Sequence, residues 1–114
     1  MITIDHQDTH VSITVLAEFT LADFMEFETL VMSKTAAGKP LRLLMDLREM
    51  ASFTLDMAWE EVKFSRAHAG DFERIGIVTD SEWVTWSTWL QRLFVTAELR
   101  VEHDIEDLRA WLLA

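Results

Sequence analysis

The sequence predicts a single α/β domain in which an N-terminal β-hairpin precedes alternating helices and strands around a mixed, largely parallel sheet. Residues 41–48 form an almost uninterrupted apolar run, which is typical of a strand buried on both faces. Residues 1–17 hold two short runs in which apolar and polar side chains alternate. Strand-like runs then alternate with helical periodicity, which indicates crossover connections and parallel pairing. The expected order is β-β-α-β-α-β-α-β-α.

Five segments are predicted as strands. The first two, Met1–Asp5 and His10–Ala17, flank the polar residues 6–9 and form the hairpin. Residues 41–48 form the central strand, and a loop from Arg48 to Thr54 is expected to follow it. Residues 74–79 predict another buried strand, and residues 97–101 predict a last short one.

The first helix is expected from residue 21 onward. Thr20 and Asp23 have the spacing of a capping box, in which each side chain serves a free backbone N–H group. Gly38 ends this helical region and Pro40 prevents its return. One face is apolar through residues at three- and four-residue spacing, namely Leu21, Phe24, Phe27, Leu30 and Val31.

The second helix, expected from residue 55 to about residue 69, is apolar on two sides. Its main stripe consists of Leu55, Ala58, Trp59 and Val62. Met57 and Phe64 lie on nearly the opposite side, so the helix carries more apolar surface than one contact with a sheet needs.

Two further helices complete the pattern. The third is expected over residues 82–94, with an apolar stripe that consists of Trp83, Trp86, Leu90, Leu93 and Phe94, and with Trp89 at its edge. The last starts at Asp104 and carries Leu108, Trp111 and Leu112.

Length and composition limit the classes of function. The chain has 114 residues, which predicts one domain over residues 1–114. Its 20 acidic and 10 basic residues give a formal charge of −10, which repels nucleic acid and anionic lipid alike. We expect no nucleic-acid partner, and at most a peripheral, transient contact with membranes.

The expected location is the cytoplasm. The chain has no cysteine, which fits a reducing compartment and excludes thiolate chemistry. Met1 leads directly into a strand-like pattern, without the basic and apolar regions of an export signal. No apolar run approaches the length that spans a membrane.

Catalysis is not expected. Asp46 and Asp80 both end predicted strands, at the edge of an α/β sheet where ligands dock. Paired carboxylates can carry out acid–base catalysis, but carboxylates at strand ends more often pair with a base, such as Arg48 or Arg74. The sequence has no nucleophile elbow, no phosphate-binding glycine loop and no cysteine nucleophile. We therefore predict a protein that is not an enzyme and needs no cofactor.

A metal site is indicated only weakly by the sequence. The residues Asp5, His6, Asp8 and His10 could supply nitrogen and oxygen ligands, yet they lie at a hairpin tip where such residues are usually solvated. We predict no metal. His68 is expected to lie at a helix C-terminus, with a role in a pocket as the alternative.

Several segments, in their order along the chain, resemble the SpoIIAA-like family, whose fold is related to STAS domains. They are Leu43–Arg48, Trp59–Phe64, His68 with Asp71–Ile75, Asp80 with Trp83, and Ala110–Leu112. The resemblance covers essentially the whole chain. It implies a regulatory or ligand-sensing module rather than a catalyst. Members of the family have been discussed as binders of small apolar ligands that associate with membranes.

Anti-sigma-factor antagonists of this fold switch partners when a serine at the start of a helix is phosphorylated. The antagonist motif resembles Asp-Ser-Ser-Gly, whereas this chain has Ser52-Phe53-Thr54-Leu55-Asp56 there, with no serine pair and no glycine. Ser52 and Thr54 could accept phosphate, but capping of the helix already explains both. The departure weakens the phosphoswitch interpretation, and Ser52, Thr54 and Asp56 remain the alternative partner-binding region.

The aromatic side chains suggest a binding slot between the second and third helices. Tryptophan offers a large apolar surface with one donor, which suits a slot for a small apolar ligand or lipid. The predicted ligand-binding residues are Trp59, Phe64, Trp83, Trp86, His68, Asp80 and Asp46. The alternatives are packing in the core, a regulatory protein partner docked near residues 53–57, and a homodimer joined through the third helix.

Overall fold

The computed structural model describes residues 1–6, 10–35, 38, 40–67, 70–79 and 98–114. The strands are β1 (Ile2–His6), β2 (His10–Phe19), β3 (Leu41–Phe53), β4 (Phe72–Val78) and β5 (Glu98–Glu102). The helices are α1 (Leu21–Thr35), α2 (Leu55–Ala67) and α4 (Ile105–Leu113). The third helix predicted over residues 82–94 lies outside the described residues. No described helix has the length and apolar character needed to cross a membrane.

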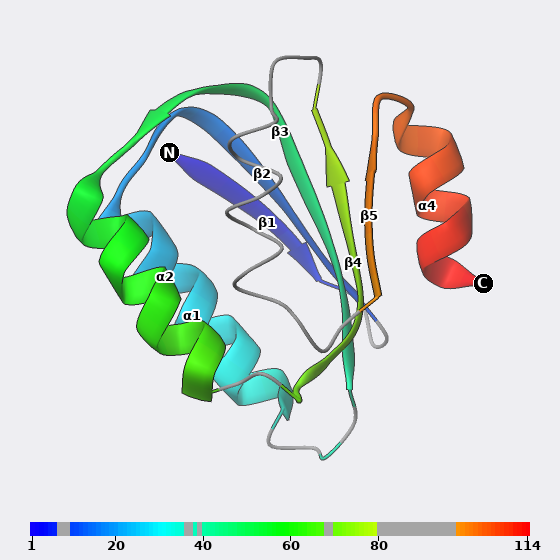
Figure 1. Ribbon diagram of the computed structural model, residues 1–114, viewed down its shortest axis with the longest axis horizontal. Coiled ribbons are helices and arrows are strands. Elements are labelled where there is room, and N and C mark those ends of the chain that lie inside the picture. The colour runs from blue at the N-terminus through cyan, green and yellow to red at the C-terminus, as the bar shows by residue number, and fades with distance from the viewer. Residues whose placement is uncertain (7–9, 36–37, 39, 68–69, 80–97) are drawn as a thin grey trace.

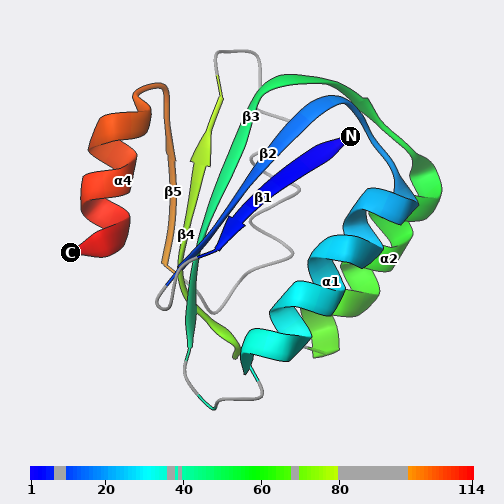
Figure 2. The ribbon, with the colours of Figure 1, turned by 180° about the vertical axis from the view of Figure 1, so that it is seen from behind.

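The strands form one mixed sheet in the order β1-β2-β3-β4-β5. β1 and β2 pair antiparallel as the predicted hairpin, with Ile4 opposite Ile13, and every other neighbouring pair is parallel. The predicted mixed α/β domain is therefore confirmed. Helices α1 and α2 cover one face of the sheet and α4 covers the other, as the two opposite views show (Figures 1 and 2).

The face under α1 and α2 holds the larger part of the core. Side chains of β2 and β3 that alternate along the strands point to this face, among them Ile13, Leu43 and Met45. α1 packs on them through Phe24, Phe27 and Val31, as its predicted stripe requires. The capping box at its start is also confirmed: Thr20 N–H donates to Asp23 Oδ2 over 3.1 Å, and Asp23 N–H donates to Thr20 Oγ1 over 3.2 Å.

Helix α2 buries the side that the sequence did not favour. Where its side chains are described, the main predicted stripe is wrong as the packing face, because Leu55 is 84% exposed and Trp59 is 65% exposed. Met57 and Phe64 are buried instead. The reason lies in the aromatic partners of Phe64, whose ring centroid lies 5.6, 5.8 and 6.3 Å from those of Phe24, Phe27 and Phe72.

The central strand is longer than predicted, and the loop expected from Arg48 to Thr54 is wrong. β3 continues to Phe53, although its pairing with β4 ends at the rung between Asp46 and Val78. Beyond that rung β2 is the described strand with which β3 pairs, and the register shifts twice along this stretch. We call residues 16–19 and 49–53 the β2–β3 extension, which curves past the end of β4 toward α1 and α2 (Figure 1).

Helix α4 closes the opposite face of the sheet. Leu108 and Leu112 are buried against Leu44 and Val78, as the sequence predicts. Gly76 permits this close approach, because a Cβ atom there would lie 2.9 Å from Cγ of Leu108. The predicted start of the helix is confirmed too, since the Asp104 side chain accepts hydrogen bonds from the N–H groups of Glu106 and Asp107.

Candidate functional site

The β2–β3 extension positions the start of helix α2. Thr54 N–H donates to the Phe19 carbonyl over 3.1 Å, which ties the first turn of α2 to the end of β2. Thr54 Oγ1 accepts a hydrogen bond from Met57 N–H over 3.4 Å, and Asp56 Oδ1 accepts from the same N–H over 2.9 Å. The predicted cap at Thr54 is confirmed. The cap predicted for Ser52 is wrong, because Ser52 lies within β3, where it is exposed.

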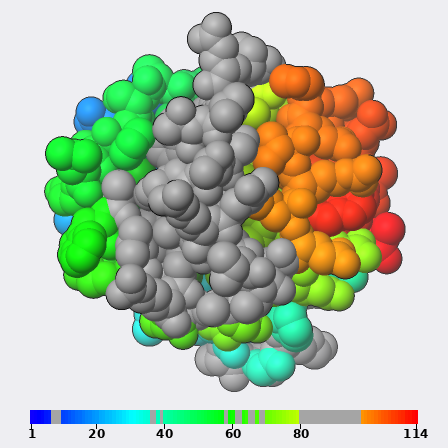
Figure 3. All heavy atoms as spheres, viewed as in Figure 1, coloured from blue at the N-terminus to red at the C-terminus, as the bar shows by residue number. Residues whose placement is uncertain are grey.

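Large apolar side chains gather at this place on the outside of the molecule. Leu55 and Trp59 are four residues apart, so they lie on one face of α2, and both are mostly exposed. Phe53, at the end of β3, is 37% exposed. We call Ser52–Asp56 together with Trp59 the α2 surface. Figure 3 shows the atoms of α2, in green, on the side of the molecule away from α4, in red.

Acidic groups border the α2 surface. Asp56 within this surface is exposed, and so is Glu18, which pairs with Ser52 across the extension. The Lys63 ammonium group, further along α2, is 3.1 Å from the Glu60 carboxylate. The described part of this surface is therefore an apolar centre with a negative border.

Asp46, the predicted end of the central strand, forms a compact ion pair with Arg48. Its two carboxylate oxygens lie 2.9 Å from Arg48 Nε and 2.6 Å from Arg48 Nη2, and Oδ1 also accepts from the Arg48 N–H over 3.1 Å. These hydrogen bonds lower the pKa of Asp46 below the usual range for a carboxyl group, although partial burial opposes them. Asp46 is thus held as a carboxylate, which suits binding rather than proton donation.

A polar hollow of about 490 Å³ lies beside this ion pair. Its described lining consists of Thr14, Asp46, Arg48 and Glu49. Side chains two residues apart on a strand share one face of the sheet, so Asp46 lies on the same face as Leu44. Leu44 packs under α4. The Asp46 carboxylate therefore belongs to the face of the sheet opposite to α1 and α2.

The described residues of the predicted ligand slot do not come together. Phe64 is part of the aromatic core with 4% of its surface accessible, and Trp59 is exposed on the outer side of the same helix. Asp46 lies on the other face of the sheet. The remaining members of the predicted slot, which are Trp83, Trp86, His68 and Asp80, lie outside the described residues.

The predicted hairpin-tip ligands give no metal site in the part of the chain that is described. Among the described residues no group of three or more histidine, aspartate or glutamate side chains converges. Asp8 lies outside the described residues, so the tip as a whole stays a prediction.

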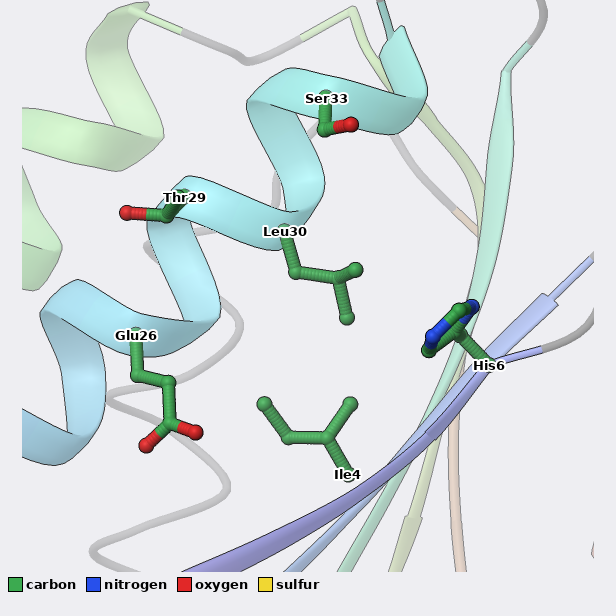
Figure 4. A pocket seen from close by; sticks show the side chains of 6 residues that line it. All are labelled: Ile4, His6, Glu26, Thr29, Leu30 and Ser33. Atoms are coloured by element: carbon green, nitrogen blue, oxygen red, sulfur yellow. The ribbon is translucent and has the colours of Figure 1, made fainter.

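A cavity that the sequence did not suggest lies between β1 and α1. Its volume is about 530 Å³, and it is lined by Ile4, His6, Glu26, Thr29, Leu30 and Ser33 (Figure 4). Ile4 and Leu30 face each other from the strand and the helix, whereas Glu26 lies at the rim. The available signal was the predicted hairpin, which assigns β2 to one edge of β1 and assigns no strand to its other edge.

A protein-family model described as SpoIIAA-like matches residues 10–113 of the chain. The chain belongs to the SpoIIAA-like family. The match spans β2 through α4, so it includes the β2–β3 extension and the α2 surface. A comparison with curated proteins gives no match.

Solved structures share the fold of this SpoIIAA-like chain. One is a protein of the DUF3478 family with a SpoIIAA-like fold from Shewanella loihica PV-4, with a TM-score of 0.79, 24% identity, and coverage of 98% of this chain and 92% of that one. A second is the anti-sigma factor antagonist SpoIIAA in its unphosphorylated form, with a TM-score of 0.63, 9% identity, and coverage of 100% and 99%. A third is an anti-sigma factor antagonist from Mycobacterium paratuberculosis, with a TM-score of 0.60, 15% identity, and coverage of 100% and 94%.

Proposed function

We propose that this SpoIIAA-like protein is a non-catalytic regulatory module that binds a protein partner through the α2 surface. The observation that carries the proposal is the exposure of Leu55 and Trp59 on one face of a helix whose other face is buried. Two structures of the same fold are of anti-sigma factor antagonists, which supports a role in protein–protein regulation.

The energetics of the α2 surface favour a protein as the occupant. Complete burial of a leucine side chain contributes about 1.5–3 kcal/mol. Tryptophan is enriched among the residues that dominate binding energy at interfaces, particularly when neighbouring contacts exclude water. Leu55 and Trp59 project from the same side of a rigid helix, so binding them requires little ordering of the backbone.

The border of the surface defines the partner's chemistry. Glu18, which pairs with Ser52, and Asp56 on α2 place negative charge beside the apolar centre. A complementary partner therefore presents an apolar patch with lysine or arginine beside it, and these basic residues also accelerate its encounter with a chain of charge −10.

Regulation by phosphate fits Ser52 better than Thr54. The Ser52 side chain is exposed, whereas Thr54 is half-buried and its hydroxyl group caps α2. Phosphate at either residue would add about −1.5 to −2 charges to the α2 surface. Because the proposed partner is basic at its border, Ser52→Glu should strengthen its binding rather than release it.

Affinity capture from extracts of the source cells tests the proposal. Wild type should retain a specific protein that Leu55→Asp fails to retain, because the aspartate places an unpaired charge in the apolar centre. Met32→Asp on α1 is the matched control, since Met32 is 55% exposed and lies outside the α2 surface. Equal recovery with both variants, or recovery of nothing specific by wild type, would refute the proposal.

A small apolar ligand or lipid is the second candidate, and the cavity between β1 and α1 is the described feature that favours it. It has a volume of about 530 Å³ and is open to solvent, and Ile4 and Leu30 give it the apolar surface that a compact ligand would contact. Native mass spectrometry of freshly purified protein should then show a co-purified molecule. Bare protein throughout, with no complex detected by the same measurement after fatty acids are added, would end this candidate.

A further inference from the structure

The outer edge of strand β1 is open in the described part of the chain. β1 is the first strand in the sheet order, and β2 is the strand with which it pairs. Edge strands present rows of unpaired N–H and C=O groups, and proteins commonly protect them with lysine, proline or a bulge. β1 reads Ile-Thr-Ile-Asp-His, with neither lysine nor proline, and its register with β2 runs without a shift.

The register between β1 and β2 shows which residues of β1 direct their N–H and C=O groups to the open edge. Leu16 N–H donates to the Met1 carbonyl over 2.7 Å, so Met1 and Leu16 form a hydrogen-bonded pair. Such pairs alternate along an antiparallel ladder. The backbone groups of Ile2, Ile4 and His6 therefore point away from β2, toward the open edge.

The same residues face the cavity with their side chains. Ile4 and His6 line it from the strand, and α1 supplies its other wall (Figure 4). An extended segment that pairs with β1 would thus place every second side chain over the cavity. Opposite Ile4, that side chain would meet the apolar surface of Ile4 and Leu30.

We propose that the β1 edge binds an extended, cationic segment of another protein, which adds antiparallel to β1 as a sixth strand and places one apolar side chain in the β1–α1 cavity. Strand addition of this kind obtains affinity from backbone hydrogen bonds and specificity from alternate side-chain pockets. Glu26 is exposed at the rim, so a lysine or arginine two residues from the apolar side chain would lie near its carboxylate.

The negative net charge of the chain favours a cationic segment at the β1 edge over a second copy of the chain. Self-association along β1 would bring together two molecules that each carry a formal charge of −10, with a Glu26 at the rim of each cavity. A cationic segment would instead be attracted by the negative charge at this edge. The β1 edge shares no residue with the α2 surface, so the two sites can be tested separately.

A designed peptide provides the test. The probe is the acetylated, amidated heptapeptide Thr-Lys-Thr-Leu-Thr-Lys-Thr, whose leucine and lysines share one face of a strand. Binding should shift the amide resonances of Ile4 and His6 and protect them from hydrogen exchange, because both N–H groups gain acceptors. Methylation of the leucine nitrogen, which removes one donor to Ile4, should weaken binding by about tenfold.

Protein variants sharpen the test. Ile4→Pro removes an outward N–H group at a position where edge strands tolerate proline, and it should weaken binding by about tenfold. Glu26→Lys leaves the backbone intact and should weaken binding by at least about threefold at low salt. Glu49→Lys makes the same change of net charge on the β2–β3 extension and should bind as wild type does.

Four results would overturn the proposal. They are the absence of peptide binding, resonance shifts centred away from β1, equal losses in Glu26→Lys and Glu49→Lys, and a concentration-dependent dimer that Ile4→Pro dissociates. The last result would assign the edge to a second copy of this chain.

Discussion

Helices α4 and α2 each carry one described tryptophan, and the surroundings of the two side chains differ. Trp111 on α4 is half-buried, with the guanidinium carbons of Arg74 and Arg100 at 5.5 and 5.6 Å from its ring centroid. Trp59 on α2 is 65% exposed. The arginines stabilise Trp111 through cation–π contacts, so its role is explained within the domain. Trp59 extends the apolar surface outward, where a partner can cover it.

The same contrast holds for the helices as a whole. The C-terminus of α4 is held by the sheet, because Arg42 Nη1 donates to the Leu112 carbonyl over 2.8 Å and Arg74 Nη1 donates to the Trp111 carbonyl over 2.7 Å. Helix α2 is held by its buried side and by its start on the extension. The α4 face therefore supports the fold, whereas the outer face of α2 carries the exposed side chains of Leu55 and Trp59.

The largest expected effect separates the two sides of α2. Phe64→Ala should lower the free energy of unfolding by about 3–5 kcal/mol, because it empties the centre of the aromatic core. Trp59→Ala should change that free energy by less than about 0.5 kcal/mol, since the side chain is mostly exposed. Urea unfolding followed by circular dichroism measures both. Comparable losses in the two variants would contradict the assignment of α2's faces.

The next largest effect probes the contact between α4 and the sheet. Gly76→Ala should destabilise the domain by about 1–3 kcal/mol, because the new Cβ would meet the fully buried Leu108 at 2.9 Å. Gly70→Ala is the matched control, since nothing lies within 4 Å of a Cβ atom at that position. Thermal unfolding of the two variants compares them directly. Equal stability would show that α4 is less tightly packed than the structure indicates.

A smaller effect is expected at the C-terminus of α4. Arg74→Met keeps the aliphatic stem but removes the hydrogen bond to the Trp111 carbonyl and one cation–π contact, which should cost about 1–2 kcal/mol. Lys63→Met on α2 breaks an exposed ion pair and should cost less than about 0.5 kcal/mol. Chemical unfolding measures the stability of both variants. An equal loss of stability would show that the contacts of Arg74 with α4 matter no more than the exposed ion pair on α2.

The smallest effect concerns Asp46 and Arg48. Because Arg48 lowers the pKa of Asp46 in the folded protein, the pair stabilises the fold above the ordinary carboxyl pKa, and this contribution is lost as the pH falls through the lowered pKa. Arg48→Met should raise the pKa of Asp46 and remove about 0.2–1 kcal/mol of stability at neutral pH, a small amount because Arg48 is partly exposed. NMR titration of the Asp46 carboxyl carbon measures the shift. An unchanged titration would contradict the ion pair.

Most of the fold follows from the sequence because its signals are local. The capping box at Thr20, the helix start at Asp104 and the alternating strands depend on residues close together in the chain, and these predictions are confirmed. The Asp46–Arg48 pair was also among the expected partners, since the two residues are two positions apart.

The wrong predictions concern features that depend on residues far apart in the sequence. Helix α2 is apolar on two sides, and its periodicity alone does not select between them. Phe64 is buried because Phe24, Phe27 and Phe72 come from other elements to meet it. The apolar run ends at Arg48 and a loop was predicted after it, yet β3 continues there because β2 supplies a partner strand.

The central claim, that the outer face of α2 binds a protein, is tested most directly by photo-crosslinking in the source cells. A benzophenone amino acid placed at Trp59 should give one predominant crosslinked protein, whereas the same amino acid placed at Met32 should not capture it. Adding Leu55→Asp to the Trp59 probe should reduce the yield by at least about tenfold. Crosslinking that is equal at both positions, or insensitive to Leu55→Asp, would contradict the account.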